Sequence, residues 1–247
     1  MSWKQMWMVG VGCLVGGAAW AADAGEVIAS ADEAMNRAQD QIIDWKVVNQ
    51  EPGKSEPKVM VFTSTVRGAK ALTSFSAPPD MKGTRVLVLG RQQMYIYLPA
   101  YGKVRRVASH TTQQGFMGTT FSFDDMNTSR FGDIYDAKKV SEEGTTVTLE
   151  LTSKGEAPYA KAEVQFDTTM GHPLQMKYYN DKGQHVKTET RSKYDCNEEF
   201  NVCLPGVIRM EDHTRDGAWT ELQRQDWKLN TGVSEDVFST RTLQLGD

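Results

Sequence analysis

The chain has 247 residues, of which 39% are hydrophobic, and 28 Lys and Arg against 32 Asp and Glu give a net charge of −4. The basic residues are scattered, whereas nucleic-acid binding requires clustered Lys and Arg that neutralise phosphates. We therefore expect no nucleic acid as a partner. A chain of this length suits a single domain that buries about 70% of its unfolded surface, which leaves room for a core and a cavity.

The first residues are typical of an export signal. Lys4 supplies a positive start, Met6 to Ala18 carries no charge, and Ala19-Trp20-Ala21 has small residues where a signal peptidase reads. The apolar run is shorter than the roughly 20 residues that span a bilayer. We predict that residues 1–21 are a signal peptide cleaved after Ala21, and that residues 22–247 form one periplasmic domain. An uncleaved membrane anchor is the alternative.

Cysteine usage agrees with export. Once Cys13 leaves with the signal peptide, Cys196 and Cys203 remain as an even pair in a compartment where disulfides persist. A bridge between them would close a short connection between two strands and contribute about 2–3 kcal/mol in the chain-entropy model. The six-residue spacer differs from the C-x-x-C arrangement of redox catalysts, so a structural disulfide is the prediction.

Hydrophobic periodicity predicts one helix followed by many strands. Val27, Ile28, Ala31 and Ala34 recur at three- and four-residue intervals, which indicates an amphipathic helix. From residue 47 onward the period is two, as in 146–151 and 161–166, and Gly-containing turns separate the strands. About ten antiparallel strands with one strong helix favour a curved, half-open β-barrel over a parallel α/β fold. We expect the helix and the non-alternating stretch 110–127 to cover its open side.

Several short motifs occur in an order that resembles the periplasmic outer-membrane lipoprotein-sorting proteins, the LolA-like group. They are Phe75-Ser76-Ala77-Pro78-Pro79 with Lys82-Gly83-Thr84-Arg85, Tyr97-Leu98-Pro99, Val104-Arg105-Arg106, Phe116-Met117-Gly118, Phe121-Ser122-Phe123-Asp124-Asp125-Met126 and Asp236-Val237-Phe238. The resemblance covers nearly the whole chain after the leader. One departure is Thr120, where the family pattern has an aspartate before the Phe-Ser pair.

The resemblance implies a half-open antiparallel barrel whose apolar concave face, closed by helices, holds acyl chains of lipoproteins or other lipids. The expected activity is transport of these chains toward the outer membrane, with an inner-membrane transporter and an outer-membrane acceptor as partners and the protein itself a monomer. No cofactor is expected. A sensor or adaptor that binds lipoprotein and a protein partner in envelope-stress regulation is the alternative. Such regulators usually carry a second C-terminal domain, for which the chain has no room after Phe238.

The expected ligand-binding residues belong to one strand and to the segment that should form a lid. They are Met94, Ile96, Leu98, Phe116, Met117, Phe121 and Phe123. The lid side chains suit ordinary core about as well as a ligand wall, and a register error of one residue would exchange the strand set for Tyr95 and Tyr97. Arg106 is expected to contact a head group or the lid. The alternative is that Arg105 and Arg106 form a solvated pair on an edge strand, which is the simpler interpretation of Arg105.

No catalytic motif is found. The sequence contains no G-x-S-x-G elbow, no H-E-x-x-H and no phosphate-binding G-x-x-x-x-G-K, so we expect no enzyme activity and no metal site. Glu211-Asp212-His213 comes closest, but on a strand only Glu211 and His213 share a face. The carboxylates of Asp124 and Asp125 fit helix capping better than acid-base catalysis.

Overall fold

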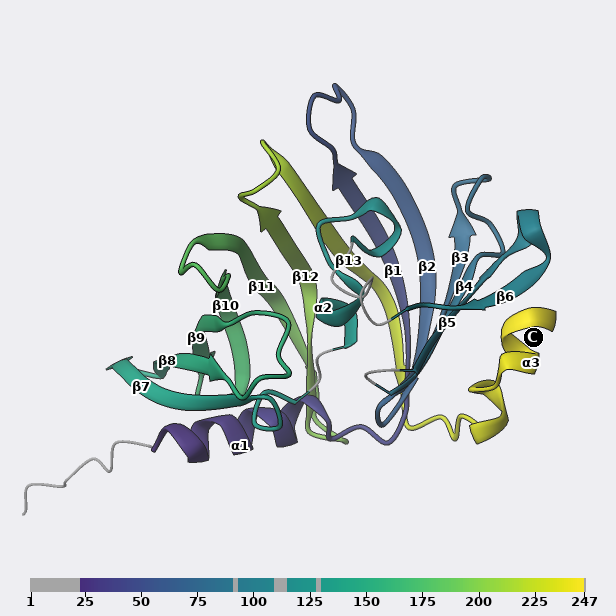
Figure 1. Ribbon diagram of the computed structural model, residues 1–247. Coiled ribbons are helices and arrows are strands. Elements are labelled where there is room, and N and C mark those ends of the chain that lie inside the picture. Colours follow the sequence, from purple (N-terminus) through teal and green to yellow (C-terminus); the bar gives the residue numbers. More distant parts are fainter. Residues whose placement is uncertain (1–22, 91–92, 109–114, 128–129, 247) are drawn as a thin grey trace, which may run out of the picture.

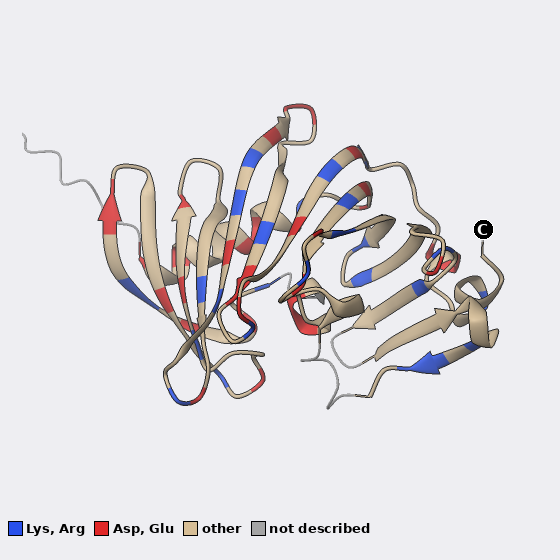
Figure 2. Ribbon diagram, turned by 90° about the horizontal axis from the view of Figure 1, so that it is seen from above, with Lys and Arg blue, Asp and Glu red and all other residues tan. Residues whose placement is uncertain are grey.

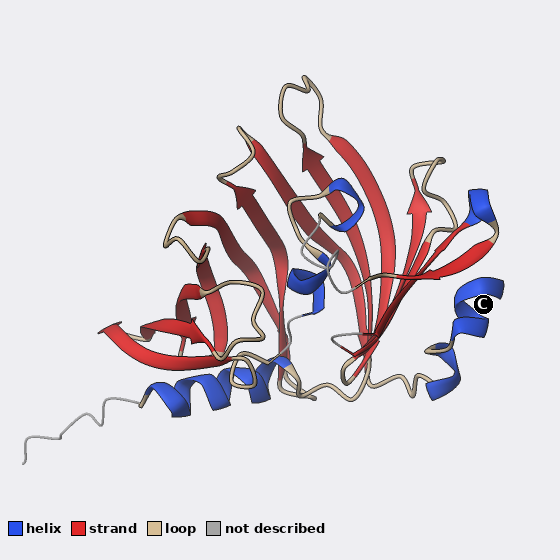
Figure 3. Ribbon diagram, in the orientation of Figure 1, coloured by secondary structure: helices blue, strands red, loops and turns tan. Residues whose placement is uncertain are grey.

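The computed structural model describes residues 23–90, 93–108, 115–127 and 130–246, so the expected signal peptide and its cleavage site lie outside the described residues, as does 110–114 of the expected lid. Figure 1 shows the elements in chain order, and Figure 3 separates the helices from the sheet. The helical elements are α1 (Ala24–Met35), η1 (Pro99–Tyr101), η3 (Phe116–Gly118), α2 (Phe123–Asn127), η4 (Glu235–Val237) and α3 (Thr240–Leu245). The strands are β1 (Gln41–Gln50), β2 (Lys58–Arg67), β3 (Lys70–Ala77), β4 (Arg85–Gly90), β5 (Gln93–Leu98), β6 (Lys103–Arg106), β7 (Tyr135–Glu143), β8 (Thr146–Ser153), β9 (Lys161–Asp167), β10 (His172–Tyr179), β11 (His185–Asn197), β12 (Val202–Asp212) and β13 (Ala218–Leu229).

The thirteen strands of the described residues belong to one antiparallel sheet in the order β6-β5-β4-β3-β2-β1-β13-β12-β11-β10-β9-β8-β7. Strands β1 to β6 pair in chain order, as do β7 to β13, and the two runs join at the centre, where β1 pairs with β13. The sheet curves strongly and does not close, because β6 and β7 are its free edges (Figure 1). The prediction of a half-open antiparallel barrel is confirmed, with thirteen strands in place of about ten.

The alternation in the sequence produces the core of the concave side. On β8, Val147, Leu149 and Leu151 are fully buried, and they pair with Phe166, Val164 and Ala162 of β9, which are fully buried as well. The intervening polar residues of both strands are only half-buried. Successive side chains of a strand point to opposite faces, so one face of each strand reaches the core and the other meets water.

The predicted N-terminal helix is present as α1 and packs against the half of the sheet that contains β7, β10 and β12 (Figure 1). Its buried face carries Val27, Ile28 and Ala31. Next to them the carboxylate of Asp32 accepts hydrogen bonds from the backbone N–H groups of Phe131 and Gly132, at 2.7 and 2.8 Å. Burial raises the pKa of Asp32 above its ordinary value despite these bonds. The carboxylate therefore fixes the chain just before β7 against α1.

A second apolar cluster lies on the opposite, convex face of the sheet. It consists of Leu72, Leu87, Val233, Phe238 and Leu243, and α3 packs there against β4, β5 and β6. Strand β5 therefore has apolar packing on both faces, since one face contributes to the concave core and the other to this second cluster. Among the described residues, no helix is both long and apolar enough to cross a membrane.

The predicted disulfide is confirmed. Cys196 of β11 and Cys203 of β12 are directly paired in the sheet and bonded to each other, with their Cα atoms 4.0 Å apart. The bridge closes the end of the β11–β12 hairpin, the longest hairpin of the sheet. It lies far along the chain from the segments that cover the concave face.

The joint between the sheet and the C-terminal segment depends on Asp40. Its buried carboxylate accepts hydrogen bonds from the N–H and hydroxyl of Thr231 and from the N–H groups of Gly232 and Val233, over 2.7–3.2 Å. Burial alone would raise the pKa of Asp40, but these hydrogen bonds outweigh it and hold the pKa below its ordinary value. The ionised carboxylate is thus the form that stabilises the fold.

We predict that Asp40→Asn lowers the free energy of unfolding by about 1–3 kcal/mol at neutral pH, because an amide cannot accept all four hydrogen bonds. The folded-state pKa is the lower one, so this stabilisation is complete above the unfolded pKa of about 3.9 and is lost as the pH falls through the folded value. Urea unfolding from pH 3 to 7 should therefore show the two proteins converging in acid. The exposed Asp226→Asn is the control, and an equal loss in both variants would contradict the role of Asp40.

Candidate binding site on the concave face

The topology forces one segment across the open side of the sheet. The free edges β6 and β7 are consecutive in the chain, so residues 107–134 must connect one rim of the half-barrel to the other. We call residues 115–127, which include η3 and α2, the strap. Figures 1 and 3 show it over the middle of the concave side. The position of the expected lid is therefore determined by the order of the strands and not by the secondary-structure propensity of the lid itself.

The strap begins as a tight loop held by its own backbone. Gly115 and Ser122 form an isolated antiparallel bridge, and the N–H of Phe116 donates to the carbonyl of Phe121 at 2.6 Å. Met117 and Gly118 make the turn with φ of 53° and 83°, a left-handed conformation that favours glycine. Gly115 is needed for another reason, because a Cβ there would lie 2.6 Å from the carbonyl oxygen of Thr119.

The short helix α2 starts with a capping box. The hydroxyl of Ser122 accepts from the N–H of Asp125 at 3.0 Å, and the carboxylate of Asp125 accepts from the N–H of Ser122 at 2.7 Å. This reciprocal pair satisfies two N–H groups that a helix start leaves without partners. The predicted capping role is thus confirmed for Asp125.

Buried polar groups attach the loop to the central strands. Thr120 is 2% exposed, its N–H donates to the hydroxyl of Thr220 on β13, and its own hydroxyl donates to the carbonyl of Met210 on β12. Asn49 of β1 accepts from Thr220 and donates to the carbonyl of Gly118. Thr120, the departure from the family pattern, is a neutral anchor for the strap in this chain.

One side of the strap inserts aromatic side chains into the wall made by β2 to β5. The ring of Phe116 lies 6.0 Å from that of Phe75 and 5.2 Å from that of Phe123, and Phe75 continues the row to Phe62. Phe116 and Phe121 are 5% and 4% exposed. These side chains occupy the concave space that would otherwise be open.

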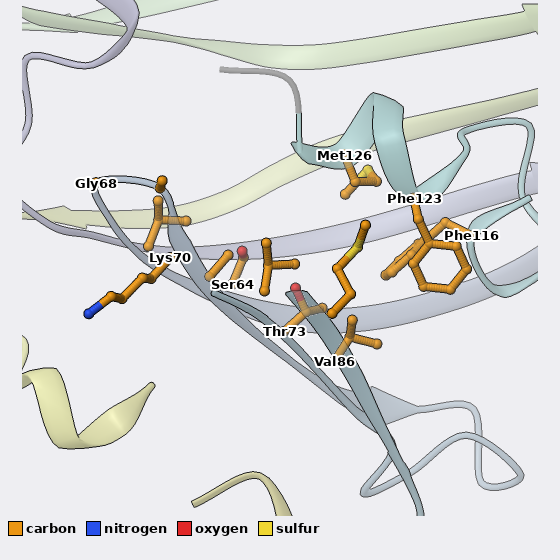
Figure 4. A pocket seen from close by; sticks show the side chains of 13 residues that line it. Ser64, Gly68, Lys70, Thr73, Val86, Phe116, Phe123 and Met126 are labelled. Carbon is orange, nitrogen blue, oxygen red and sulfur yellow. The ribbon is translucent and has the colours of Figure 1, made fainter. Parts of the chain in front are cut away.

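A pocket of about 120 Å³ remains beside the strap. Figure 4 shows Phe116 and Phe123 at one end and Lys70 at the other, with its amine turned away from the pocket. The strands contribute Ser64, Val66, Thr73, Val86, Val88 and Met94, and the strap contributes Phe116, Phe123 and Met126. A void of only about 10 Å³ lies on the other side of Phe116, so there the packing is nearly complete.

The opposite side of the strap is polar. Asp125 accepts from the hydroxyl of Tyr159 at 2.8 Å and from the amine of Lys187, on β11, at 2.9 Å. The side chains of Asp125 and Lys187 are 3% and 13% exposed. Burial and the nearby carboxylate raise the pKa of Tyr159 well above its ordinary value, so its hydroxyl keeps the proton that it donates. Helix α2 therefore spans from an apolar wall to a polar one.

The predicted ligand-binding residues separate into three groups. Met94, Phe116 and Phe123 line the pocket together, while Met117 and Phe121 line the small void with Phe116. Ile96 packs against the same concave core without lining either space. Leu98 is half-buried at the end of β5 and lines neither, whereas Tyr95 and Tyr97 pack on the convex cluster.

Arg106 lies on the exposed edge strand β6, which is the blue arrow at the rim of the sheet in Figure 2, and it does not line the pocket. Sequence reasoning missed Met126, the polar pocket residues Ser64 and Thr73, and the pair Tyr159 and Lys187. Alternation along β2 and β3 could have indicated the pocket residues. The partners of Asp125 depend on contacts between distant segments, for which the sequence holds no local signal.

The structure pairs two histidines that appear unrelated in the sequence. His185 and His213 both contact the hydroxyl of Thr188 through Nε2, at 2.9 and 2.8 Å. Within the described part of the chain, no group of three or more His, Cys, Asp or Glu side chains is arranged to hold a metal ion.

A family model described as "Uncharacterized protein" matches residues 67–245. The chain belongs to this family. No curated protein matches the sequence significantly. Among solved structures, a domain assigned to outer-membrane lipoprotein sorting from Vibrio parahaemolyticus aligns with a TM-score of 0.79 and 24% identity, over 88% of this chain and 97% of that one.

Two further structures share the fold. A DUF1329 family protein from Desulfovibrio piger aligns with a TM-score of 0.80 and 21% identity, over 89% of this chain and 97% of its own. A LolA superfamily protein from Nitrosomonas europaea aligns with a TM-score of 0.73 and 18% identity, over 89% and 98%. The predicted LolA-like fold is therefore confirmed.

We predict that Gly115→Ala loosens the strap while leaving the sheet folded, because the new Cβ would collide with the carbonyl of Thr119. Chymotrypsin should then cleave after Phe116 or Phe121 faster than in the parent protein. Gly25→Ala in α1 is the control, since a Cβ there meets its nearest neighbour at 3.4 Å, an ordinary contact. Equal cleavage rates in both variants would show that the loop does not depend on Gly115.

Proposed function

We propose that the protein is a periplasmic carrier that binds acyl chains of lipoproteins or other lipids on its concave face and delivers them toward the outer membrane. An inner-membrane transporter would load it and an outer-membrane acceptor would receive the cargo. The export signal predicted at residues 1–21 supports the location, and the LolA-like fold supports the class of ligand. The residues proposed to act on the ligand are those of the pocket and strap. Met94 belongs to the wall that receives the ligand, and Phe116 and Phe123 of the strap fill this wall when the protein is empty.

The observation that carries this proposal is the filling of an apolar concave wall by side chains of a separate, polar-anchored segment. A remaining space of about 120 Å³ is comparable to an engineered cavity of about 150 Å³ that accepts a benzene ring. A long acyl chain needs more room, so its entry requires Phe116 and Phe123 to move out. Each methylene it then buries recovers about 0.8 kcal/mol, which favours binding without any catalytic group.

The same arrangement provides a means of release. Because Phe116, Phe121 and Phe123 refill the wall when the strap returns, the empty protein is stable without its ligand. The net free energy of ligand binding is only the difference between burying the ligand and burying the strap side chains that it displaces. Net affinity is therefore lower than the acyl chain alone would give, as a carrier that must hand on its cargo requires.

The direct test is mass spectrometry under native conditions of protein purified from the envelope of cells that produce it naturally. We expect masses above that of the processed chain, which release acyl-bearing species on denaturation. Cleavage after Ala21 should be visible in the same spectra. Repeated recovery of ligand-free protein, from preparations that retain lipids on other carriers, would contradict the proposal.

Phe116→Ala should bind an alkyl probe several-fold more tightly than the parent protein, because the probe no longer has to displace the phenyl ring. Calorimetric titration with dodecyl maltoside below its critical micelle concentration measures this. The variant should also lose about 3–5 kcal/mol of stability, as large-to-small core changes do.

Phe238→Ala is the matched control, since Phe238 is as deeply buried but belongs to the convex cluster. It should lose similar stability with unchanged probe affinity. If both variants gained affinity equally, general loosening rather than the strap would explain the effect.

A further inference from the structure

The inner face of β11 carries a row of charged side chains that is unusual for a wall expected to contact lipid. Lys187, Glu189 and Arg191 alternate along the strand and are all largely buried, with side chains 13%, 4% and 19% exposed. Arg191 donates to Glu189 at 2.7 Å, and Glu189 also accepts from the hydroxyl of Tyr178. Two members of the row therefore satisfy each other.

The third member, Lys187, is satisfied from outside the sheet. Its amine pairs with Asp125 of the strap at 2.9 Å and lies 5.7 Å from the ring of Tyr159. Among the described residues, Asp125 is the only carboxylate that pairs with Lys187. Tyr159 in turn donates its hydroxyl to the same carboxylate and stacks on Tyr178, with ring centroids 4.4 Å apart. Lys187 and Tyr159 thus form a two-donor receptor that holds one carboxylate.

Strap opening changes the charge balance at this receptor. In the closed state two cations, Lys187 and Arg191, face two carboxylates, Asp125 and Glu189. When the strap lifts, Asp125 leaves with it and Glu189 stays bonded to Arg191, so Lys187 loses its counter-ion. A cation in a partly desolvated position attracts a replacement anion, and an oxyanion can accept from both donors as the carboxylate did.

We propose that Lys187 and Tyr159 bind the anionic head group of the ligand in the open state, and that Asp125 occupies this site as a substitute anion when the strap is closed. The inference rests on the proposed function, because it assumes that acyl chains displace the strap. It narrows the ligand class to amphiphiles whose head group carries a phosphate or carboxylate. Head-group binding and strap closure then exclude each other at one pair of donors.

Calorimetric titration with dodecyl phosphate and with dodecyl maltoside, both below their critical micelle concentrations, tests this. The parent protein should bind dodecyl phosphate about tenfold or more tightly than the uncharged probe, as a charge-assisted hydrogen bond provides. Lys187→Gln should abolish this preference, so that the two probes bind with similar affinity. Because the strap also loses its bond to Lys187 in this variant, maltoside affinity should not fall. Tyr159→Phe should reduce the preference by removing one donor, and it provides an independent test if Lys187→Gln folds poorly.

Lys177→Gln is the matched control, because Lys177 pairs with Glu163 at 3.0 Å and lies between the buried Met176 and Tyr178 on β10, so its side chain points to the opposite face of the sheet. It should keep the full preference.

Equal affinity of the parent for both probes, or a preference that survives in Lys187→Gln, would overturn the head-group site while leaving the carrier function standing. Inorganic phosphate binding as tightly as dodecyl phosphate would show a free-anion site instead. Failure of both alkyl probes to bind would reject the proposed function itself.

Discussion

The structure depends on one constraint, which is that a single strongly curved sheet has an apolar concave face that must be kept from water. Helix α1 covers part of it, beside β7, β10 and β12. The rest is reached by the strap, which belongs to the connection between the free edges β6 and β7. Strand order thus places a short segment, the strap, where a ligand of a half-open barrel would lie. In the proposed carrier, covering the face and binding a ligand are competing uses of the same surface.

The strap is suited to this competition because its two sides use different interactions. Its aromatic side chains gain by burial, which is non-directional and can be replaced by any apolar chain of adequate size. Its polar groups, Asp125 and Thr120, make directional bonds to fixed partners. Displacement must therefore supply both apolar area and a substitute for the polar bonds. An amphiphile has both parts, whereas a simple hydrocarbon has only one.

The local sequence pattern predicted those elements that are determined by residues close together in the chain. The alternation of Val147, Leu149 and Leu151, the spacing on α1 and the even pair of cysteines each specify structure within one hairpin or helix. Residues whose role depends on contacts between distant parts of the chain could not be predicted in this way. Lys187 meets Asp125 across 62 residues of sequence, and the convex cluster around Leu243 requires the C-terminal helix to return to β4. Met94 and Leu98 share one strand parity, yet only Met94 lines the pocket, because the strap lies over one end of β5.

The most direct measurement is hydrogen exchange of the strap amides with and without saturating dodecyl maltoside. In the closed protein the N–H groups of Phe116 and Thr120 are bonded to Phe121 and Thr220, so they should exchange slowly. Displacement by the ligand should accelerate exchange over residues 116–126 while β1 and β13 remain protected. Strap amides that stay as protected, or become more protected, in the ligand-bound protein would contradict a movable cover and with it the whole account.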